Sequence, residues 1–567
     1  MTSAQAFLSA RDFLLANGTD YGAAVSGFQW PATERFNWAL DVFDPMAEHS
    51  GSPGLVFAGP DGIHASRSFA ELAARSNQLA NLLRDRGVAR GDRLLVMLPN
   101  VIALWETMLA AMKLGVVIIP STPQLARADL EDRFARGDAG HVVTDAEGVA
   151  KMGDLGAGGV RIAVGASAPG WLGYDLVDGA SPILVDPGVT HGSDPLLLYF
   201  TSGTTAKPKL VLHTHRSYPV GHLTTMYWLG LRPGDRHCNI SSPGWAKHAF
   251  SSFFAPWIAG ATIVVYDWPK IDPRAVLDTL IRSDATVFCA PPTLWRMLIN
   301  ENLEQRRTGL RECLSAGEPL NPEVIERVRK AWGLTIREGY GQTETTLLVG
   351  NFPGQPVRPG AMGLPAPGCR VELRPVAVGG EEVASEGDGE ISVALSPEAV
   401  GLMEGYLDDP SKMARAREEG FYRTGDVAVR DADGYFTYVG RTDDVFKSSG
   451  YRLSPFELES VLIEHPAVAE AAVVESPDPV RLVVPKAFIA TRAGFAPGRE
   501  VALDIFRFLQ SRLPPYKRIR RLEFAELPKT ISGKIRRVEL RLRERQHPGA
   551  GPMAFREEDF PELKNSR

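Results

Sequence analysis

YFTSGTTAKPK, residues 199–209, is the stretch around which the chain is organised. It follows three leucines, Leu196 to Leu198, and these apolar residues predict a short buried strand. A strand that ends in small hydroxylated residues offers backbone N–H groups and hydroxyl donors, and the two lysines add positive charge. These are the components of an anion-binding loop. The Gly-Lys-Ser/Thr triplet of a Walker loop is missing, and a solvated loop is the alternative interpretation.

The length and composition indicate an ordinary globular protein of two or more domains. At 567 residues the chain is too long for one hydrophobic core. A net charge of −6 gives no general attraction to nucleic acid, and four cysteines without a CxxC pair predict neither zinc nor a disulfide framework. No apolar run approaches the roughly 20 residues of a membrane span, and no secretory signal is expected. We therefore expect a cytoplasmic protein, either monomer or dimer.

The order of strands and helices predicts a parallel α/β architecture. Ser68 and Glu71 form a capping box that opens an amphipathic helix, which ends near Gly87. A helix over 101–114 lies between two apolar strands and so makes a βαβ unit. Further strands and helices alternate from residue 261 to residue 344, and a helix is expected over 244–257.

The texture of the chain changes after residue 360. Short strands and turns predict a β-rich subdomain up to about residue 440, and a compact α/β unit with a helix over 455–464 follows. We expect an N-terminal domain over 1–440, a C-terminal domain over 441–545 and a loose polar tail over 546–567.

Six motifs occur in an order that resembles a known family. They are YFTSGTTAKPK, SAGEPLNPE (315–323), YGQTE (340–344), YRTGD (422–426), GRTDDVFKSSGYR (440–452) and PKTISGKIRR (528–537). Nearly end to end, the chain resembles the adenylate-forming superfamily of acyl-CoA synthetases, luciferases and peptide-synthetase adenylation domains. FNWALDVFD (36–44) and HPAVAEAAVVESPDPVR (465–481) most resemble the medium-chain acyl-CoA synthetase branch. The resemblance implies a large N-terminal domain of parallel α/β sheets with a small β subdomain, and a small mobile C-terminal α+β domain.

The resemblance also implies a two-step reaction. A carboxylate attacks the α-phosphate of ATP to give an acyl-adenylate and pyrophosphate, and the thiol of coenzyme A then displaces AMP. Such chemistry needs positioning and charge stabilisation rather than a covalent nucleophile. We expect an AMP-forming acyl-CoA ligase that uses ATP, Mg²⁺ and coenzyme A to activate a medium-chain, branched or aryl carboxylic acid.

The nucleotide site follows from the resemblance residue by residue. The β- and γ-phosphates would be wrapped by Thr201, Ser202, Gly203, Thr204, Thr205 and Lys209. Ala206 stands where the family usually has a second glycine, and alanine costs about 1 kcal/mol if the loop needs a positive φ there. Glu344 would bind Mg²⁺, a hard cation that prefers oxygen ligands, and Thr343 would contact the α-phosphate. Thr204, Thr343, Glu344 and Lys534 are the expected catalytic residues.

The adenosine part of ATP would lie between motifs from three places in the sequence. The purine site would be lined by Gly317, Glu318, Pro319, Gly339, Tyr340, Gly341 and Gln342. Tyr340 would stack on adenine, although a buried core tyrosine is the alternative. Asp426 would accept hydrogen bonds from both ribose hydroxyls, with Arg441 nearby.

The C-terminal motifs would serve both half-reactions. Lys534 would neutralise the charge that grows on the α-phosphate and the carboxylate, whereas a solvated basic face is the alternative. Asp443 matches the hinge about which the C-terminal domain rotates. The pantetheine tunnel would be lined by Ser449, Gly450 and Tyr451.

The acyl pocket is the least determined part of the site. In the family, acetate-specific members carry tryptophan at the position of Gly341, so Gly341 and Gly339 predict a floor open to larger acids. The helix over 244–257 would line the pocket with Trp245, His248 and Ala249. His248 would either bind a polar substituent or be satisfied within the protein. No acidic residue lies in 241–257, which argues against an amino acid substrate.

Two other functions remain open at this stage. An acyl-AMP ligase would pass the acyl group to the phosphopantetheine of a carrier protein, which presents the same thiol as coenzyme A. A nucleotide-binding protein without turnover is the more distant alternative, and Ala206 is the feature in its favour.

Overall fold

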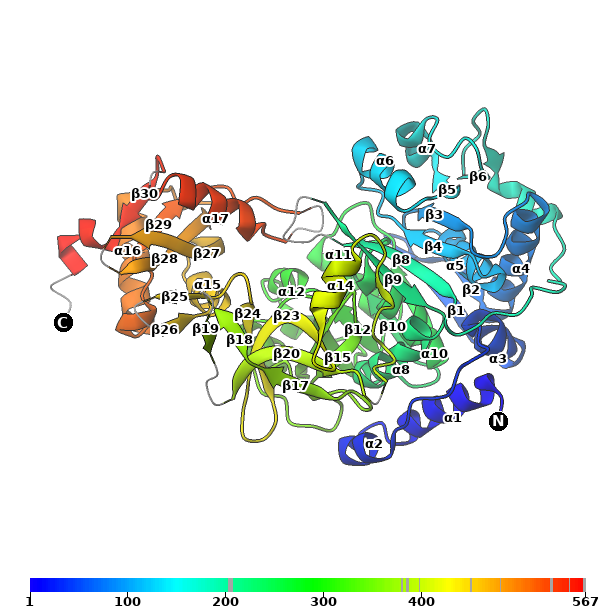
Figure 1. Cartoon of the computed structure of the whole chain (residues 1–567), viewed down its shortest axis with the longest axis horizontal. Helices are drawn as coiled ribbons and strands as arrows, with labels where there is room; N and C mark the ends of the chain where they lie inside the picture. The colour runs from blue at the N-terminus through cyan, green and yellow to red at the C-terminus, as the bar shows by residue number, and fades with distance from the viewer. Residues whose placement is uncertain are drawn as a thin grey trace. The chain divides into compact units, whose positions relative to one another are not determined.

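The computed structural model describes residues 1–201, 207–378, 381–383, 387–396, 398–448, 451–479, 481–530, 534–549 and 551–563. The chain forms two compact units (Figure 1). Unit 1 comprises residues 1–371 and 394–422, and unit 2 comprises residues 372–393 and 423–567. The chain passes from unit 1 to unit 2 within strand β23 (Phe421–Arg430).

A nine-stranded sheet is the larger of two sheets in unit 1. Its strands, in spatial order, are β16 (Leu364–Pro365), β15 (Thr346–Gly350), β14 (Ile336–Gln342), β13 (Glu312–Ala316), β12 (Val287–Ala290), β10 (Arg236–Asn239), β11 (Thr262–Tyr266), β1 (Pro53–Gly59) and β2 (Gly62–Ser68). Neighbours from β14 to β1 pair in parallel, and the strands outside them pair antiparallel. The central strands are almost continuously apolar, as expected for parallel strands that are covered on both faces.

The second sheet of unit 1 has eight strands and carries the motif YFTSGTTAKPK. In spatial order they are β21 (Gly405–Tyr406), β9 (Lys209–Thr214), β8 (Pro195–Thr201), β4 (Val117–Pro120), β3 (Arg93–Met97), β5 (His141–Asp145), β6 (Arg161–Val164) and β7 (Leu172–Gly173). β3, β4, β5, β6, β7 and β8 pair in parallel, whereas β9 and β21 are added antiparallel at one edge.

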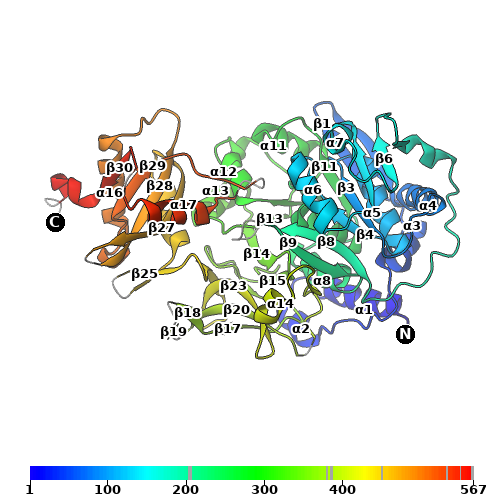
Figure 2. The same ribbon diagram turned by 45° about the horizontal axis from the view of Figure 1, so that its top comes forward.

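Helices flank both sheets of unit 1. They are α1 (Ser3–Ala16), α2 (Tyr21–Gly27), α3 (Asp44–His49), α4 (Phe69–Asp85), α5 (Ile102–Leu114), α6 (Arg127–Arg136), α7 (Ala146–Met152), α8 (Ser217–Leu229), α9 (Ala246–Ala249), α10 (Ala255–Ile258), α11 (Pro273–Arg282), α12 (Pro292–Leu298), α13 (Pro322–Trp332) and α14 (Pro410–Ala416). α4 and α5 lie side by side, and α7 packs beside β5 and β6 (Figures 1 and 2). Two π-helical turns are present, η1 (Ala39–Phe43) and η3 (Phe250–Phe254).

The structure confirms the predicted α/β architecture. The expected βαβ unit is β3–α5–β4, and its strands pair in parallel with Arg93 opposite Val117. The expected capping box opens α4: the Glu71 N–H donates to Ser68 Oγ at 3.1 Å, and the Ser68 N–H donates to the Glu71 carboxylate at 2.7 Å. Both signals were local in sequence, so they could be recognised without knowledge of the tertiary structure.

Unit 2 combines an antiparallel β region with a small α/β body. The β region comprises β17 (Val371–Arg374), β18 (Val376–Val378), β19 (Glu381–Val383), β20 (Asp388–Ala394), the later part of β23 and β24 (Phe436–Arg441), while β22 (Arg417–Glu418) lies in unit 1. The α/β body comprises β25 (Phe446–Ser448), β26 (Tyr451–Leu453), α15 (Pro455–Ile463), β27 (Val468–Asp478), β28 (Leu482–Thr491), α16 (Arg499–Arg512), β29 (Arg521–Phe524), α17 (Arg537–Gln546) and β30 (Ala554–Arg556).

The prediction of a loose tail after residue 545 is wrong for the described part of that segment. β30 pairs antiparallel with β29, and two short 3₁₀ turns, η6 (Glu557–Asp559) and η7 (Pro561–Leu563), follow it. Phe560 is 1% exposed and packs on Phe506 with the ring centroids 5.5 Å apart. The segment is polar in composition, but its strand pairing and the buried side chains of Phe560 and Leu563 attach it to the core of unit 2.

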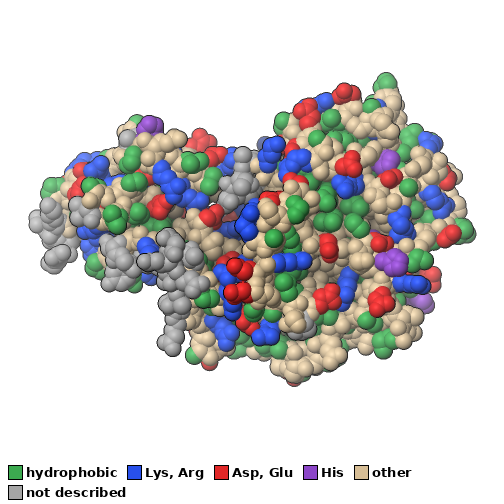
Figure 3. All heavy atoms as spheres, in the orientation of Figure 1, with side chains coloured by type: hydrophobic (Ala, Val, Ile, Leu, Met, Phe, Trp, Pro, Cys, Tyr) green, Lys and Arg blue, Asp and Glu red, His purple; other side chains and the backbone are tan. Residues whose placement is uncertain are grey.

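The surface of unit 1 carries charged side chains of both signs. Lys and Arg side chains are interspersed with Asp and Glu over the face of unit 1 in Figure 3. Within the described ranges, no helix has both the length and the apolar character needed to cross a bilayer.

Candidate functional site

The β8–β9 hairpin places the first motif at the edge of a sheet. Thr201 and Lys209 are opposite each other in the register of the two strands, and residues 202–206 between them lie outside the described residues. The predicted ligands Ser202, Gly203, Thr204 and Thr205, together with Ala206, therefore have no structural account here. The Thr201 hydroxyl is buried without a hydrogen-bond partner in the described structure. A buried hydroxyl of this kind is suited to an anionic ligand that completes its hydrogen bonding.

Glu344 lies in the turn between β14 and β15, and protein groups hold both its backbone and its carboxylate. Glu344 is 8% exposed, and its Oε1 atom accepts a hydrogen bond of 3.0 Å from the Tyr406 hydroxyl. Lys209 Nζ is 3.5 Å from the same oxygen. The Glu344 carbonyl accepts a hydrogen bond from the Met403 N–H at 2.8 Å. The structure thus brings together two residues that were assigned to the site, Glu344 and Lys209, and adds Tyr406, which the sequence did not indicate.

His213 holds the backbone of the same turn. Its Nε2 lies 2.6 Å from the Thr343 carbonyl oxygen, which can only accept, so Nε2 carries the proton. Its Nδ1 lies 3.0 Å from Ser217 Oγ. Burial lowers the pKa of His213 from 6.5 to about 4, so the ring is neutral at physiological pH. His213 therefore holds the backbone of Thr343, the residue expected at the α-phosphate.

The predicted purine residues converge at the carboxyl ends of β13 and β14. Ala316 pairs with Gly339, which places the turn of Gly317, Glu318 and Pro319 beside Tyr340. Gly317 has a φ of +106°, a conformation that favours glycine, and open space on its Cβ side.

A carboxyl group supports this turn from the core. The Leu320 N–H donates to Glu338 Oε1 at 2.7 Å, and burial raises the pKa of Glu338 to about 8. A protonated Glu338 avoids the cost of a buried charge beneath the turn.

Gly339 and Gly341 have no free space on their Cβ sides. A Cβ at Gly339 would lie 2.5 Å from the Trp228 indole. A Cβ at Gly341 would lie 2.0 Å from the carbonyl oxygen of Thr346. The hairpin is tight at this point, and Thr346 itself has a φ of +57°. Both glycines therefore have a packing reason that is independent of substrate. Their membership of the acyl pocket stays a prediction.

The expected continuous helix over 244–257 is interrupted. α9 ends at Ala249, the π turn η3 follows, and Ser252 has non-helical φ and ψ of −125° and 21°. The Trp105 indole N–H donates to the Ser252 carbonyl at 2.7 Å. π turns inside helices occur frequently at functional sites, and this one changes which residues share a face. Residues before and after Ser252 therefore do not share one continuous helical face.

Three residues of that segment were expected in the acyl pocket. Trp245 is extended and precedes α9, and Ala249 is buried. His248 is 3% exposed, and its Nε2 lies 3.0 Å from Asn100 Oδ1. Burial lowers the pKa of His248 to about 3, so it is a neutral, satisfied histidine in this structure. Such a group can act toward a substrate only as a neutral hydrogen-bonding partner.

In unit 2, Asp426 and Arg441, the two residues expected at the ribose, form an ion pair. They are opposite each other in the β23–β24 register, and Arg441 Nη1 is 3.2 Å from Asp426 Oδ1. Asp426 is 5% exposed. Asp443 lies in the turn after β24, where Arg441 Nε is 3.7 Å from Asp443 Oδ1.

Lys534 is exposed at the end of a small loop in unit 2. The Thr530 N–H donates to the Lys534 carbonyl at 2.8 Å, and the Lys534 N–H donates to Thr530 Oγ1 at 3.1 Å. Lys529 and Ile535 form an isolated bridge that closes the loop. Ser449 and Gly450, expected at the pantetheine tunnel, lie outside the described residues, and nothing is described of the Tyr451 side chain.

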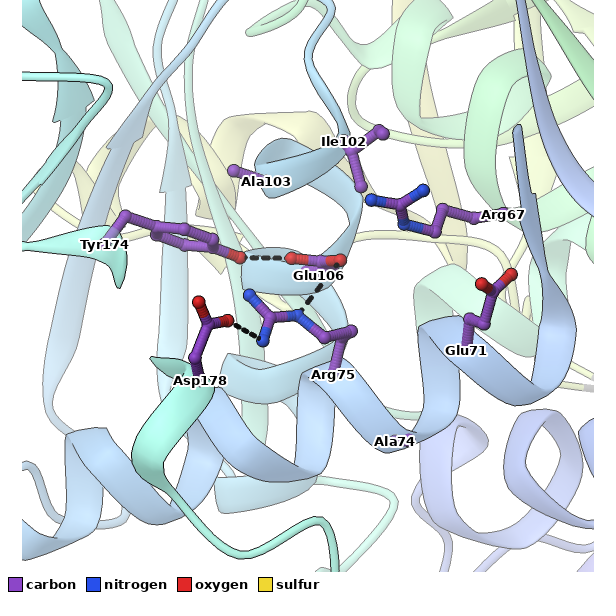
Figure 4. A pocket seen from close by; sticks show the side chains of 9 residues that line it. All are labelled: Arg67, Glu71, Ala74, Arg75, Ile102, Ala103, Glu106, Tyr174 and Asp178. Atoms are coloured by element: carbon purple, nitrogen blue, oxygen red, sulfur yellow. Dashed lines mark hydrogen bonds and ion pairs between the residues drawn. The ribbon is translucent and has the colours of Figure 1, made fainter. Parts of the chain in front are cut away.

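A cavity of about 540 Å³ lies elsewhere in unit 1, between α4, α5 and the turn η2 (Tyr174–Gly179) (Figure 4). None of the predicted site residues lines it. The Tyr174 hydroxyl donates to Glu106 at 2.5 Å, and Arg75 pairs with Asp178 at 2.5 Å. Arg75, Glu106 and Asp178 are thus engaged with one another or with Tyr174 (Figure 4).

Comparison with known proteins decides the family. The sequence model of the AMP-binding enzyme matches residues 44–407, and that of the AMP-binding enzyme C-terminal domain matches residues 457–534. The chain belongs to the AMP-binding enzyme family. The predicted resemblance to adenylate-forming enzymes is therefore confirmed.

Relatives of this AMP-binding enzyme include several acid–CoA ligases. 4-Hydroxybutyrate--CoA ligase 1 of Metallosphaera sedula is 43% identical over 535 residues, which cover 93% of this chain and 94% of the relative. The mitochondrial acyl-coenzyme A synthetase ACSM3 of Homo sapiens is 38% identical over 548 residues, which cover 93% of each chain. This AMP-binding enzyme is accordingly an AMP-forming acid–CoA ligase of the short- to medium-chain type, as predicted.

Solved structures share the fold of this AMP-binding enzyme. The anthranilate CoA ligase AuaEII, in complex with anthranoyl-AMP, has a TM-score of 0.81 at 27% identity and covers 91% of this chain and 98% of its own. A benzoate CoA ligase from Burkholderia xenovorans LB400 has a TM-score of 0.74 at 28% identity, with coverages of 89% and 100%.

The residues present are compatible with ATP and a single Mg²⁺ ion. Among the described residues no group of three or more His, Cys, Asp or Glu side chains forms a metal site. Mg²⁺ is commonly held by one or two carboxylates together with substrate phosphates, and Glu344 supplies one buried carboxylate. The buried Thr201 hydroxyl without a partner lies in the same sheet as Lys209.

Proposed function

We propose that this AMP-binding enzyme joins a short- or medium-chain acid, or an aryl acid, to coenzyme A through an acyl-adenylate bound at the Glu344 turn. The observation that carries the proposal is the cluster of Lys209, Glu344 and Thr343. Tyr406 contacts the side chains of Lys209 and Glu344, and His213 holds the backbone carbonyl of Thr343. Groups that are fixed before substrate arrives can stabilise charge without reorganisation in the transition state.

The first half-reaction forms a bond between a carboxylate oxygen of the acid and the α-phosphorus of ATP. The bond from the α-phosphorus to the bridging oxygen breaks, and pyrophosphate leaves with the electron pair. Thr201 and Lys209 would bind the departing phosphates, and Thr343 would orient the α-phosphate. Glu344 would hold Mg²⁺, which when bound supplies charge neutralisation at the phosphates. Lys534 would neutralise the charge that grows on the reacting carboxylate and α-phosphate oxygens.

We propose the following roles for the residues expected to contact the adenosine. Tyr340 would stack on adenine above the turn of Gly317, and Asp426 would accept hydrogen bonds from the ribose hydroxyls. Arg441 pairs with Asp426 and would keep its carboxylate oriented.

For the second half-reaction we propose a rotation of residues 441–545 about Asp443, which would exchange Lys534 for the CoA tunnel of Ser449, Gly450 and Tyr451.

The acid is proposed from the site and from the relatives together. Trp228 occupies the space beside Gly339, and the buried His248, on the segment expected to line the pocket, lies 3.0 Å from Oδ1 of the half-buried Asn100. A neutral polar pair in an apolar wall suits an acid with a hydroxyl or other small polar substituent better than a long alkyl chain. Among the relatives, three are named for acids of this kind: 4-hydroxybutyrate and anthranilate carry a small polar substituent, and anthranilate and benzoate are aryl acids.

The test is pyrophosphate release with ATP and Mg²⁺ across a panel of acids, with and without CoA. The panel contains straight-chain acids from C2 to C12, 4-hydroxybutyrate, branched acids, benzoate and anthranilate. Continuous release that requires CoA supports the proposal and identifies the acid. Release that stops after about one turnover with CoA present would instead favour a carrier-protein acceptor. No release with any acid would contradict the proposal. Cell fractionation separately tests the expected cytoplasmic location.

A further inference from the structure

Strand β21 lies at the edge of the eight-stranded sheet, beside strand β9, which begins at Lys209. β21 pairs antiparallel with β9, with Gly405 opposite Leu212 and Tyr406 opposite Val211. This register puts Tyr406 on the same face of the sheet as Lys209, which lies two residues before Val211. Tyr406 is 6% exposed.

A second lysine approaches the same tyrosine. Lys209 Nζ lies 5.2 Å from the centroid of the Tyr406 ring, and Lys412 Nζ lies 5.5 Å from it. Both distances are within the range of a cation–π contact. The Tyr406 hydroxyl meanwhile donates to Glu344, so two ammonium groups and one carboxylate are arranged around one aromatic ring.

The position of Lys412 is fixed by the surrounding structure. It is in the first turn of α14, where its N–H donates to Asp409 Oδ1 at 2.9 Å. Arg136 donates to the Pro208 carbonyl at 2.7 Å and also pairs with Asp408, so one guanidinium ties the start of β9 to the segment after β21. Lys412 is half-buried, and burial, followed by the nearby Lys209, lowers its pKa.

The charges of this cluster favour a multiply charged anion. Lys209 and Lys412 contribute two positive charges. Glu344 and the exposed Asp409 contribute two negative ones, but Asp409 is engaged with Ser411 and the α14 backbone. Two ammonium groups held near each other repel, and an anion that contacts both would remove this cost. Pyrophosphate and the β,γ end of ATP have two phosphate groups, whereas AMP has none beyond the α-phosphate.

We propose that Lys412 is a second ammonium ligand, beside Lys209, for the pyrophosphate end of ATP and for the pyrophosphate that leaves. Tyr406 acts as the positioning residue that spaces the two lysines and holds Glu344. The inference rests on the proposed function because it assumes that ATP binds at the Glu344 turn.

Equilibrium binding tests the inference without turnover. The binding of inorganic pyrophosphate with Mg²⁺, and of AMP, is measured by calorimetry for the wild type, Lys412→Met and Lys412→Arg. We expect Lys412→Met to raise the Kd for pyrophosphate about tenfold, because one charge-assisted contact is lost. AMP affinity should stay within about twofold, and Lys412→Arg should restore most of the pyrophosphate affinity because it retains the charge.

Arg415→Met is the matched control, because it removes one positive charge from the exposed side of the same helix and should leave both affinities unchanged. An unchanged Kd for pyrophosphate in Lys412→Met, or an equal weakening for AMP, would overturn the inference while leaving the proposed function intact. A wild type that binds neither ligand would overturn the proposed function and the inference with it.

Discussion

The Glu344 turn of unit 1 and the Lys534 loop of unit 2 hold their functional charges in opposite ways. Glu344 is 8% exposed, and Tyr406, Lys209 and the Met403 N–H contact its side chain or backbone. Lys534 is exposed, and the described hydrogen bonds at this residue are made by its backbone with Thr530. The first charge is fixed within a buried network, whereas the second extends from a small loop.

The difference corresponds to the two tasks of the proposed reaction. A group that must be in place before the substrate gains from rigid neighbours, because no reorganisation is then needed in the transition state. A side chain that acts in one half-reaction and moves away for the other must be exposed, while the element that carries it must be firmly packed. In unit 2 the adjoining helix is α17, where Arg537 pairs with the buried Glu459 at 2.5 Å.

The strongest test of this contrast is Lys534→Ala. We expect adenylate formation to fall by about 10³-fold, because a charge opposed to the reacting oxygens is removed from the transition state. Thioester formation from supplied acyl-adenylate should change by less than about threefold, since the proposed role of Lys534 is confined to the first half-reaction. Single-turnover assays of each half-reaction measure both rates.

Lys529→Ala is the control, because Lys529 belongs to the same loop but pairs with Glu470. Equal loss in both half-reactions of Lys534→Ala would show that the lysine does not act in the first step alone.

Arg537→Met tests the attachment of α17, the helix that follows the Lys534 loop. Glu459 is 5% exposed, and removal of its partner leaves a buried carboxylate without compensation, which costs about 3 kcal/mol. All ten tryptophans precede residue 372, so fluorescence reports on unit 1, and hydrogen exchange in α15 and α17 is the appropriate measurement.

Arg536→Met is the matched control, because the exposed pair of Arg536 with Glu539 should contribute less than about 0.5 kcal/mol. Similar protection in the two variants would mean that α17 is not anchored through Glu459.

His213→Gln tests the fixed side of the comparison. Loss of the short contact to the Thr343 carbonyl should loosen the turn and lower the rate of pyrophosphate release about tenfold. Transfer from supplied acyl-adenylate to CoA should be less affected.

His215→Gln is the control two residues away, because both ring nitrogens of His215 are buried without hydrogen-bond partners in the described structure. If the two variants lose the same activity, the contact to Thr343 has no specific role.

The pH dependence of stability gives the smallest effect. Because burial lowers the pKa of His213 from 6.5 to about 4, the unfolded chain binds an additional proton at this residue between those values. The free energy of unfolding therefore falls as the pH falls, and His213 contributes about 1.4 kcal/mol per pH unit. Urea unfolding at pH 7.5, 6 and 5 should show a shallower decline in His213→Gln. Parallel curves would contradict this assignment.

Glu338 acts in the opposite direction. Its pKa is raised to about 8, so it adds stability as the pH falls from 8 toward the ordinary value of 4.5. Because Glu338 is present in both proteins, it cancels in the comparison of wild type with His213→Gln.

The sequence by itself determined the family and the α/β architecture, and it placed Asp426 and Arg441 in two motifs that the structure brings together. Each rests on residues that are close in the chain or on motifs in a fixed order, such as the capping box at Ser68 and the YRTGD and GRTDD segments. Periodicity and capping are local properties, so they can be recognised without the partner that a helix or strand packs against.

The tertiary structure alone decided how the site is held together. His213 reaches Thr343 across 130 residues, Tyr406 reaches Glu344 across 62, and Trp228 occupies the space beside Gly339. No local pattern marks such partners, because any buried tyrosine, histidine or tryptophan looks the same in sequence. Their roles arise from strand register and close packing, which bring distant residues within bonding distance only after the chain has folded.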